Sequence, residues 1–144
     1  MIKSVTNGGA VDVLERLMQF AGQRHRIITN NIANISTPGY RMQDVSVKGF
    51  QAQLQEAIDA RRNDPATVDG PLELRETTQV RAEKDRLDLR PEPIGTNILF
   101  HDQNDRDPER LVQSLVENFV AFRTAAQFLR KEYQLINMAI TERP

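Results

Sequence analysis

The sequence predicts a mainly α-helical protein, in which long heptad helices at the two ends form a coiled-coil core around a polar, partly irregular middle segment. Apolar residues recur at alternating spacings of three and four near both ends of the chain, which is the pattern of a coiled-coil seam. The middle is polar and interrupted by proline and glycine. With 144 residues, the chain has the length of one domain.

Composition excludes several classes of function. The 19 basic and 20 acidic residues leave a formal net charge of −1, so the chain offers no basic surface for nucleic acid. No stretch approaches the roughly 20 apolar residues of a membrane span, which argues against membrane insertion. The first residues lack the pattern of a cleavable signal peptide, so sequence alone predicts a cytoplasmic protein. Absence of cysteine excludes disulfides and thiolate sites.

The N-terminal part should consist of a disordered tail over residues 1–10 and a coiled-coil helix over 11–36. Seven of the eight positions in the heptad seam of this helix are apolar, and His25 is the exception. The apolar seam residues are Val11, Leu14, Met18, Ala21, Ile28, Ile32 and Ile35. A turn and a short extended segment should follow over residues 37–47. Pro38 presets φ and Gly39 supplies the positive φ of a type II turn.

A second amphipathic helix is predicted over residues 48–62, followed by a polar loop region over 63–106. Within that region, Leu72 and Leu74 alternate with polar residues, as do Leu87 and Leu89. Alternation of this kind fits a short, loose β-hairpin, and a mobile loop explains the same residues.

The C-terminal coiled-coil helix should cover residues 107–141, because Asp107 and Pro108 suit the N-cap and first helical positions. All nine of its seam positions are apolar: Val112, Leu115, Phe119, Phe122, Ala126, Leu129, Tyr133, Ile136 and Ile140. Pairing the two end helices as an antiparallel coiled coil is the simplest arrangement. Apolar residues beside the seams would remain wet, so neighbouring copies should cover them.

No catalytic, cofactor-binding or metal site is predicted. His25 is best read as a packed or interface histidine, since His101 lies far away in sequence. The acidic run Asp102–Glu109 fails the EF-hand pattern because Arg106 occupies a ligand position. The short basic clusters Arg24–Arg26 and Arg61–Arg62 suggest solvated surface.

The junction of the first helix and its turn carries a long motif. Three asparagines crowd the helix end, where their amides should bond groups outside the helix. The motif residues are Asn30, Asn31, Ile32, Ala33, Asn34, Thr37, Pro38, Gly39 and Tyr40. They resemble the N-terminal motif of the bacterial flagellar rod and hook proteins, and the likeness continues through residues 41–45 to Phe50 and Leu54. The short chain is most similar to proximal subunits of the basal-body rod.

The resemblance implies a structural subunit rather than an enzyme. Such a subunit is exported by the flagellar type III apparatus without a cleavable signal, polymerises through its terminal helices in the periplasmic rod, and transmits torque. Its partners would be other copies of itself, FliE, and rod proteins of the FlgC, FlgF and FlgG types. A soluble helical adaptor or export chaperone that binds a partner helix along the same seams is the alternative.

Overall fold

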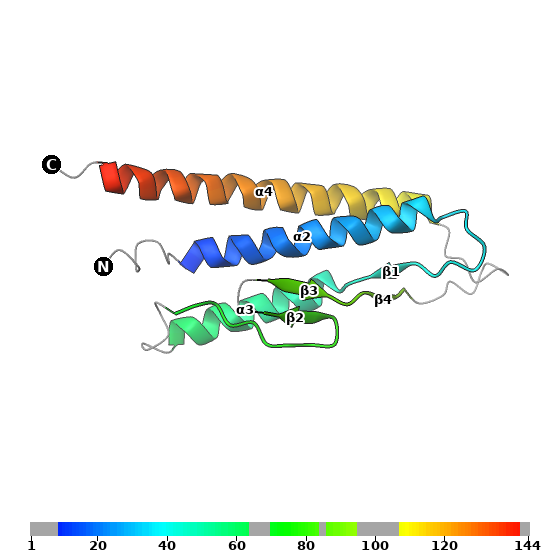
Figure 1. Cartoon of the computed structure of the whole chain (residues 1–144), viewed down its shortest axis with the longest axis horizontal. Coiled ribbons are helices and arrows are strands. Elements are labelled where there is room, and N and C mark those ends of the chain that lie inside the picture. The colour runs from blue at the N-terminus through cyan, green and yellow to red at the C-terminus, as the bar shows by residue number, and fades with distance from the viewer. Residues whose placement is uncertain (1–8, 64–69, 84–85, 95–106, 142–144) are drawn as a thin grey trace.

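The computed structural model describes residues 9–63, 70–83, 86–94 and 107–141, which form three layers (Figure 1). Helix α4, Pro108–Thr141, forms one outer layer, and helix α2, Gly9–Ala33, lies in the middle. Helix α3, Val47–Asn63, and four short strands form the third layer. The predicted mainly helical fold is confirmed. Residues 1–8 of the expected tail lie outside the described residues, and Gly9 and Ala10 already belong to α2.

Helices α2 and α4 lie side by side and antiparallel within one chain (Figure 1). The Asn118 Nδ2 atom donates to the Ala21 carbonyl at 2.8 Å, and the Tyr133 hydroxyl donates to Glu15 Oε1 at 3.1 Å. Residue numbers therefore rise along α4 as they fall along α2. The end helices thus pair within one chain, in the antiparallel arrangement that the sequence suggests as the simplest.

The strands form two small antiparallel sheets. Strand β1, Gln43–Asp44, pairs with β4, Glu92–Pro93, and β2, Val80–Ala82, pairs with β3, Leu87–Leu89. Sequence alternation suggested a hairpin joining the segments of Leu72 and Leu87. The structure pairs the Leu87 segment with Val80 instead, because the reciprocal hydrogen bonds between Glu83 and Arg86 close a tight turn between β2 and β3.

The hydrophobic core lies between α2 and the third layer, not between the two end helices. Phe20 of α2 stacks on Phe50 of α3, with ring centroids 4.1 Å apart. Around this pair, the link from β1 to α3, α3 itself and the middle segment supply the remaining buried residues: Val45, Leu54, Ala57, Leu72, Leu74, Val80, Leu87 and Leu89. The sparse leucines of the polar segment are therefore core residues, and the mobile-loop interpretation is wrong for them.

The face of α4 that meets α2 is rotated by one residue from the predicted seam. The buried positions are Leu111, Asn118 and Ala125, seven residues apart, whereas the seam residues Val112 and Phe119 are more than half exposed. Asn118 sets this register because its buried side chain reaches the Ala21 carbonyl. Ala125 allows close approach of the two helices. The predicted seam of α4 therefore lies at the edge of the interface with α2, with some of its residues partly covered and others exposed.

The helix ends follow local capping chemistry. Asp107 Oδ1 accepts the Arg110 N–H at 3.0 Å, as expected of an N-cap at the start of α4. Ser46 Oγ caps α3 by accepting the Gly49 N–H at 3.0 Å. Helix α2 ends at Ala33 rather than at residue 36, because the last backbone bonds, such as Ile35 N–H to the Ile32 carbonyl, tighten into turns.

Candidate assembly surface and its supporting turn

The turn after α2 has the geometry predicted for Thr-Pro-Gly-Tyr. The Tyr40 N–H donates to the Thr37 carbonyl at 3.3 Å, which closes a four-residue turn. Gly39 has a φ of 73°, the left-handed conformation that the third position of a type II turn requires. The chain therefore reverses direction directly after α2 and returns along it as β1.

Asn31 fastens the returning chain to α2. Its side chain is 1% exposed, and its Nδ2 atom donates to the Gln43 carbonyl at 2.6 Å. Its Oδ1 atom accepts the Tyr40 hydroxyl at 3.0 Å and the Gln43 N–H at 3.2 Å. One amide thus satisfies both backbone groups of Gln43, much as a strand partner would.

The other two motif asparagines make more local contacts. Asn30 is exposed, and its Nδ2 atom donates to the Tyr40 hydroxyl at 3.2 Å. Asn34 donates to the Asn30 carbonyl at 2.9 Å and accepts the Thr37 hydroxyl at 3.4 Å. These contacts close the end of the helix, and only Asn31 reaches a buried position among the three.

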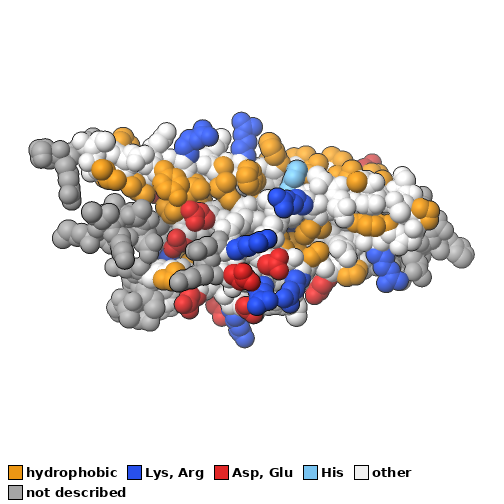
Figure 2. Space-filling view, in the orientation of Figure 1, with side chains coloured by type: hydrophobic (Ala, Val, Ile, Leu, Met, Phe, Trp, Pro, Cys, Tyr) orange, Lys and Arg blue, Asp and Glu red, His pale blue; other side chains and the backbone are white. Residues whose placement is uncertain are grey.

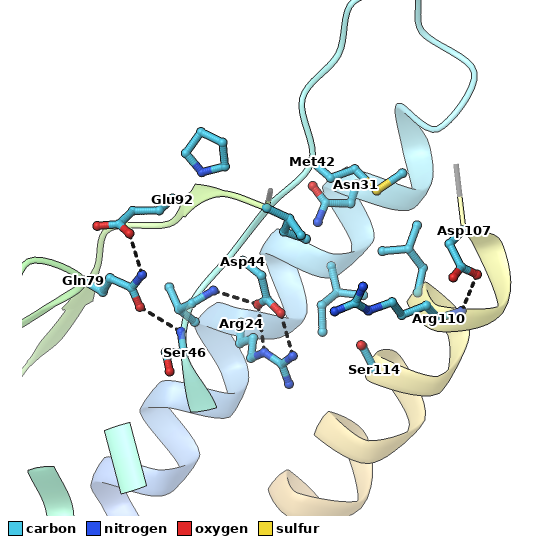
Figure 3. Close-up of a pocket in the computed structure, with 15 residues that line it drawn as sticks. Arg24, Asn31, Met42, Asp44, Ser46, Gln79, Glu92, Asp107, Arg110 and Ser114 are labelled. Atoms are coloured by element: carbon cyan, nitrogen blue, oxygen red, sulfur yellow. Dashed lines mark hydrogen bonds and ion pairs between the residues drawn. The ribbon is translucent and has the colours of Figure 1, made fainter. Parts of the chain in front are cut away.

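A bidentate ion pair joins the same two segments two turns of helix earlier (Figure 3). Arg24 Nε lies 2.9 Å from Asp44 Oδ1, and Arg24 Nη2 lies 2.7 Å from Asp44 Oδ2. The Arg24 side chain is 9% exposed, so the prediction of a solvated basic cluster is wrong for this residue. It is also wrong for Arg61, which pairs with Asp12 at 3.1 Å and donates to the Gly9 carbonyl. The net charge of the chain is only −1, so its composition gave no sign of these two ion pairs.

Two glutamines of α2 bond the backbone of β3. Gln19 Oε1 accepts the Leu87 N–H at 3.0 Å, and Gln23 Oε1 accepts the Leu89 N–H at 3.1 Å. Gln23 also donates to the Leu87 carbonyl. Glutamines four residues apart on one helical face match two residues of extended chain, since both spans are about 6 Å. The sequence analysis did not predict this contact, although the four-residue spacing of Gln19 and Gln23 is a signal that it could have used.

A polar groove of about 340 Å³ lies between α2, the β1–β4 pair and the start of α4 (Figure 3). Its charged and amide groups largely bond one another: Arg24 pairs with Asp44, and Gln79 bridges the Ser46 N–H and Glu92. Within the described ranges, no cluster of three or more histidine, aspartate or glutamate side chains could hold a metal ion. Most of the acidic run, Asp102 to Arg106, lies outside those ranges, as does His101.

Apolar side chains gather along α4 on the surface of the molecule (Figure 2). In the part of the chain that the structure describes, all ten exposed large hydrophobic side chains belong to α4, and they are 37–62% exposed. They are Val112, Val116, Phe119, Val120, Phe122, Phe128, Tyr133, Leu135, Met138 and Ile140. An apolar surface of this extent indicates an interaction site. We call this set the outer face of α4.

The predicted seam residues divide between the interior and this surface. On α2, Val11, Ala21 and Ile28 are buried, and Leu14, Met18, Ile32 and Ile35 are half-buried. On α4, Leu115, Ala126, Leu129 and Ile136 are half-buried. Val112, Phe119, Phe122, Tyr133 and Ile140 are exposed. The C-terminal seam is therefore only partly covered by α2, and exposure alone does not separate its members from α2, because the exposed Tyr133 still bonds Glu15.

His25 is exposed at the edge of the α2–α4 interface rather than packed within it. It lines an apolar hollow of about 300 Å³ together with Ala21, Gly22, Asn118, Phe119 and Phe122. The hollow opens between α2 and α4 beside the outer face of α4. His25 therefore contributes to a surface feature and not to a catalytic cluster.

Tyr133 links the distal part of α4 to the start of α2. Its hydrogen bond to Glu15 raises the pKa of the Tyr133 hydroxyl above 10.0, and partial burial and the negative charges of Glu15 and Asp12 act in the same direction. The neutral phenol is therefore the form that the folded protein favours.

No helix in the described ranges combines the length and apolar character needed to cross a membrane.

Comparison with known proteins agrees with the resemblance to flagellar rod proteins seen in the sequence. Residues 16–41, which hold most of α2 and the turn after it, match the family described as flagella basal body rod protein. The matched segment contains Asn31, Arg24 and the two glutamines that bond β3.

Two curated relatives cover different lengths of the chain. A flagellar basal body rod protein FlgB of Bacillus subtilis is 36% identical over 61 residues, which is 42% of this chain and 47% of that protein. FlgB of Borrelia hermsii is 24% identical over 134 residues, which is 91% of this chain and 95% of that protein. The predicted resemblance to flagellar rod proteins is confirmed, and these relatives belong to a structural family rather than an enzyme family.

Proposed function

From this similarity to flagellar rod proteins of the FlgB type, we propose that the chain is a subunit of the proximal rod. It is exported by the flagellar type III apparatus and polymerises in the periplasm through its terminal helices. Its neighbours are other copies of itself, FliE, and rod proteins of the FlgC, FlgF and FlgG types. The assembled rod transmits torque.

The outer face of α4 is the observation that carries this proposal. The core already lies on the opposite side of α2, and the described chain leaves these ten side chains 37–62% exposed. Burying them against neighbouring subunits stabilises the folded chain by mass action and gives a repeating contact. In the polar groove, by contrast, the groups that line it mostly bond one another.

The turn region supports the same role in a different way. Asn31 and Arg24 hold β1 against α2, and Gln19 and Gln23 hold β3 against it. Helix α2 is therefore tied along its length to the third layer. A force applied to α4 and α2 by neighbouring subunits passes into the rest of the subunit through these bonds.

A single charged substitution on the outer face tests the proposal. Val120 is 55% exposed, so Val120→Asp should change the stability of the isolated chain by no more than about 0.5 kcal/mol. In cells that carry only this variant, we expect purified hook–basal bodies to lack the protein and swimming to be lost. Gln55→Asp adds the same charge on the exposed side of α3 and should leave both unchanged.

The predicted seam positions Leu129 and Ile136 are less suitable for this test. Leu129 follows Leu111 by 18 residues, which is five helical turns, and Ile136 follows Asn118 by the same interval. Both side chains therefore point toward α2, and a charge there would disturb the fold as well as the assembly. Normal swimming and normal incorporation of Val120→Asp would refute the proposed role of the outer face.

The alternative function, a soluble helical adaptor or export chaperone, uses the same apolar surface for a single partner helix. Cell fractionation separates the two functions. A rod subunit copurifies with hook–basal bodies after detergent extraction, whereas an adaptor stays in the cytoplasmic fraction. Recovery of the wild-type protein from the cytoplasm alone would favour the adaptor.

A further inference from the structure

Two overlapping heptad seams run along α4 from residue 111 to residue 129. Both seams contain Leu115, Phe122 and Leu129. One seam adds Leu111, Asn118 and Ala125, and the other adds Val112, Phe119 and Ala126. Each seam keeps the alternating three- and four-residue spacing of a coiled coil. Turning α4 about its own axis by roughly 50°, half the angle between adjacent residues, would exchange one seam for the other.

Burial of apolar surface alone favours the seam that the structure does not use. The two seams differ most at one position, where the first has Asn118 and the second has Phe119. Nevertheless Asn118 is 4% exposed, whereas Val112 and Phe119 are 55% and 52% exposed. Phe119 also borders the open apolar hollow between α2 and α4, so there is space for it to turn toward α2. Some other contact must therefore hold α4 in the observed rotation.

The buried amide of Asn118 makes that contact. Its Nδ2 atom donates to the Ala21 carbonyl at 2.8 Å. Turning α4 would break this bond and leave the buried amide without a partner, which costs more than the bond itself contributes. Among the described residues, the other side-chain hydrogen bond between the two helices joins Tyr133 to Glu15. That bond is exposed and joins two long side chains, so it constrains the rotation of α4 less than Asn118 does.

We propose that Asn118 is the residue that keeps the assembly surface of this chain exposed. Its bond to α2 selects the seam of Leu111 and Ala125, and so leaves Val112 and Phe119 on the outer face of α4 for neighbouring subunits. In coiled coils, a buried polar residue selects one register in the same way, at a cost in stability. The inference rests on the proposed function, because it assigns Asn118 a role in presenting the outer face of α4.

Thiol labelling of the purified protein tests the rotation, because the chain has no native cysteine. Val112→Cys reports on the competing seam. Val120→Cys is the matched control, since Val120 is equally exposed and follows Leu111 by nine residues, about 180° around the helix. Adding Asn118→Leu should slow labelling of Val112→Cys by about tenfold or more, because a buried thiol reacts only when the structure opens locally. Labelling of Val120→Cys should not change.

Equal labelling of Val112→Cys with and without Asn118→Leu would overturn the proposal. Leucine is the better helix former and buries more apolar surface, so Asn118→Leu should melt at or above the wild-type temperature. A lower melting temperature with faster labelling at both cysteines would show that Asn118 only stabilises the fold, and would also overturn the proposal.

A seam-exchange variant provides a second test. Asn118→Leu combined with Phe119→Asn moves the polar residue into the competing seam, so the original rotation becomes the more apolar one. Fast labelling of Val112→Cys should therefore return. Slow labelling in this variant would contradict the selection of the seam by the polar residue.

Incorporation into basal bodies separates this inference from the proposed function. In cells that carry only Asn118→Leu, incorporation should fall about tenfold, because side chains that neighbouring subunits would bury are already covered. Slow labelling of Val112→Cys together with normal incorporation would refute the role proposed for the outer face of α4, and the selection of the seam by Asn118 would stand.

Discussion

Replacing Asn31 with alanine should destabilise the protein by roughly 2–3 kcal/mol. The substitution removes three hydrogen bonds at a position that is 1% exposed, and each contributes about 1 kcal/mol net. Alanine is the better helix former by about 0.5 kcal/mol, which offsets part of this loss. The two backbone groups of Gln43 lose their partner on α2, so β1 should loosen first.

Urea unfolding followed by far-UV circular dichroism measures this loss. With a slope of about 2 kcal/mol per molar urea, the midpoint should fall by about 1 M while the slope stays unchanged. Asn30→Ala is the matched control, because it makes the same substitution one residue earlier at an exposed site. It should shift the midpoint by less than half as much. Equal shifts for the two variants would refute the reasoning that burial makes Asn31 the structural member of the motif.

Three further predictions concern the turn, the ion pair and the α2–α4 contact. Gly39→Ala should lower the unfolding free energy by about 1–2 kcal/mol, because its φ of 73° strains any residue with a Cβ; unchanged stability would contradict this. Arg24→Met and Asp44→Ala should each cost about 2 kcal/mol, and the double variant little more than either, whereas additive losses in a double-mutant cycle would exclude coupling. Because Glu15 raises the pKa of Tyr133, the stability contributed by the neutral phenol is present below pH 10.0 and is lost as the pH rises through the folded-state pKa. Tyr133→Phe should flatten alkaline denaturation curves, and an unaltered pH profile would count against the contact.

The helices and the turn could be predicted from sequence because their signals are local. Proline followed by glycine specifies the turn through backbone sterics alone, and Asp107 before Pro108 specifies the start of α4. Heptad spacing likewise shows where each end helix runs. These features depend on residues within a few positions of one another.

The register of α4 and the position of the core depend on residues far apart in sequence. The stripe on α4 is wider than a two-helix seam, so apolar spacing cannot choose between Val112 and Leu111. A polar side chain, Asn118, makes the choice by bonding α2. Leu74 and Leu87 resemble loop residues in the sequence because their neighbours are polar, and only the folded structure shows that they belong to the core cluster that contains Phe20.

The candidate site was predictable in part for the same reason. Sequence marked three asparagines but could not distinguish the buried Asn31 from the exposed Asn30, since both precede the same turn. It also gave no reason to connect Gln19 and Gln23 with a strand more than 60 residues later. When side chains bond a distant backbone, the sequence shows only the spacing of those side chains and not the segment that they bond.

The glutamine contacts have a mechanical consequence. Gln19 and Gln23 meet Leu87 and Leu89 in register along one axis, so a pull on α2 parallel to that axis would load both attachments simultaneously. Attachments strained in shear must break together, whereas attachments peeled from one end fail one after another. The contact between α2 and β3 should therefore resist a force parallel to the helix axis far better than a force that separates the two elements from one end.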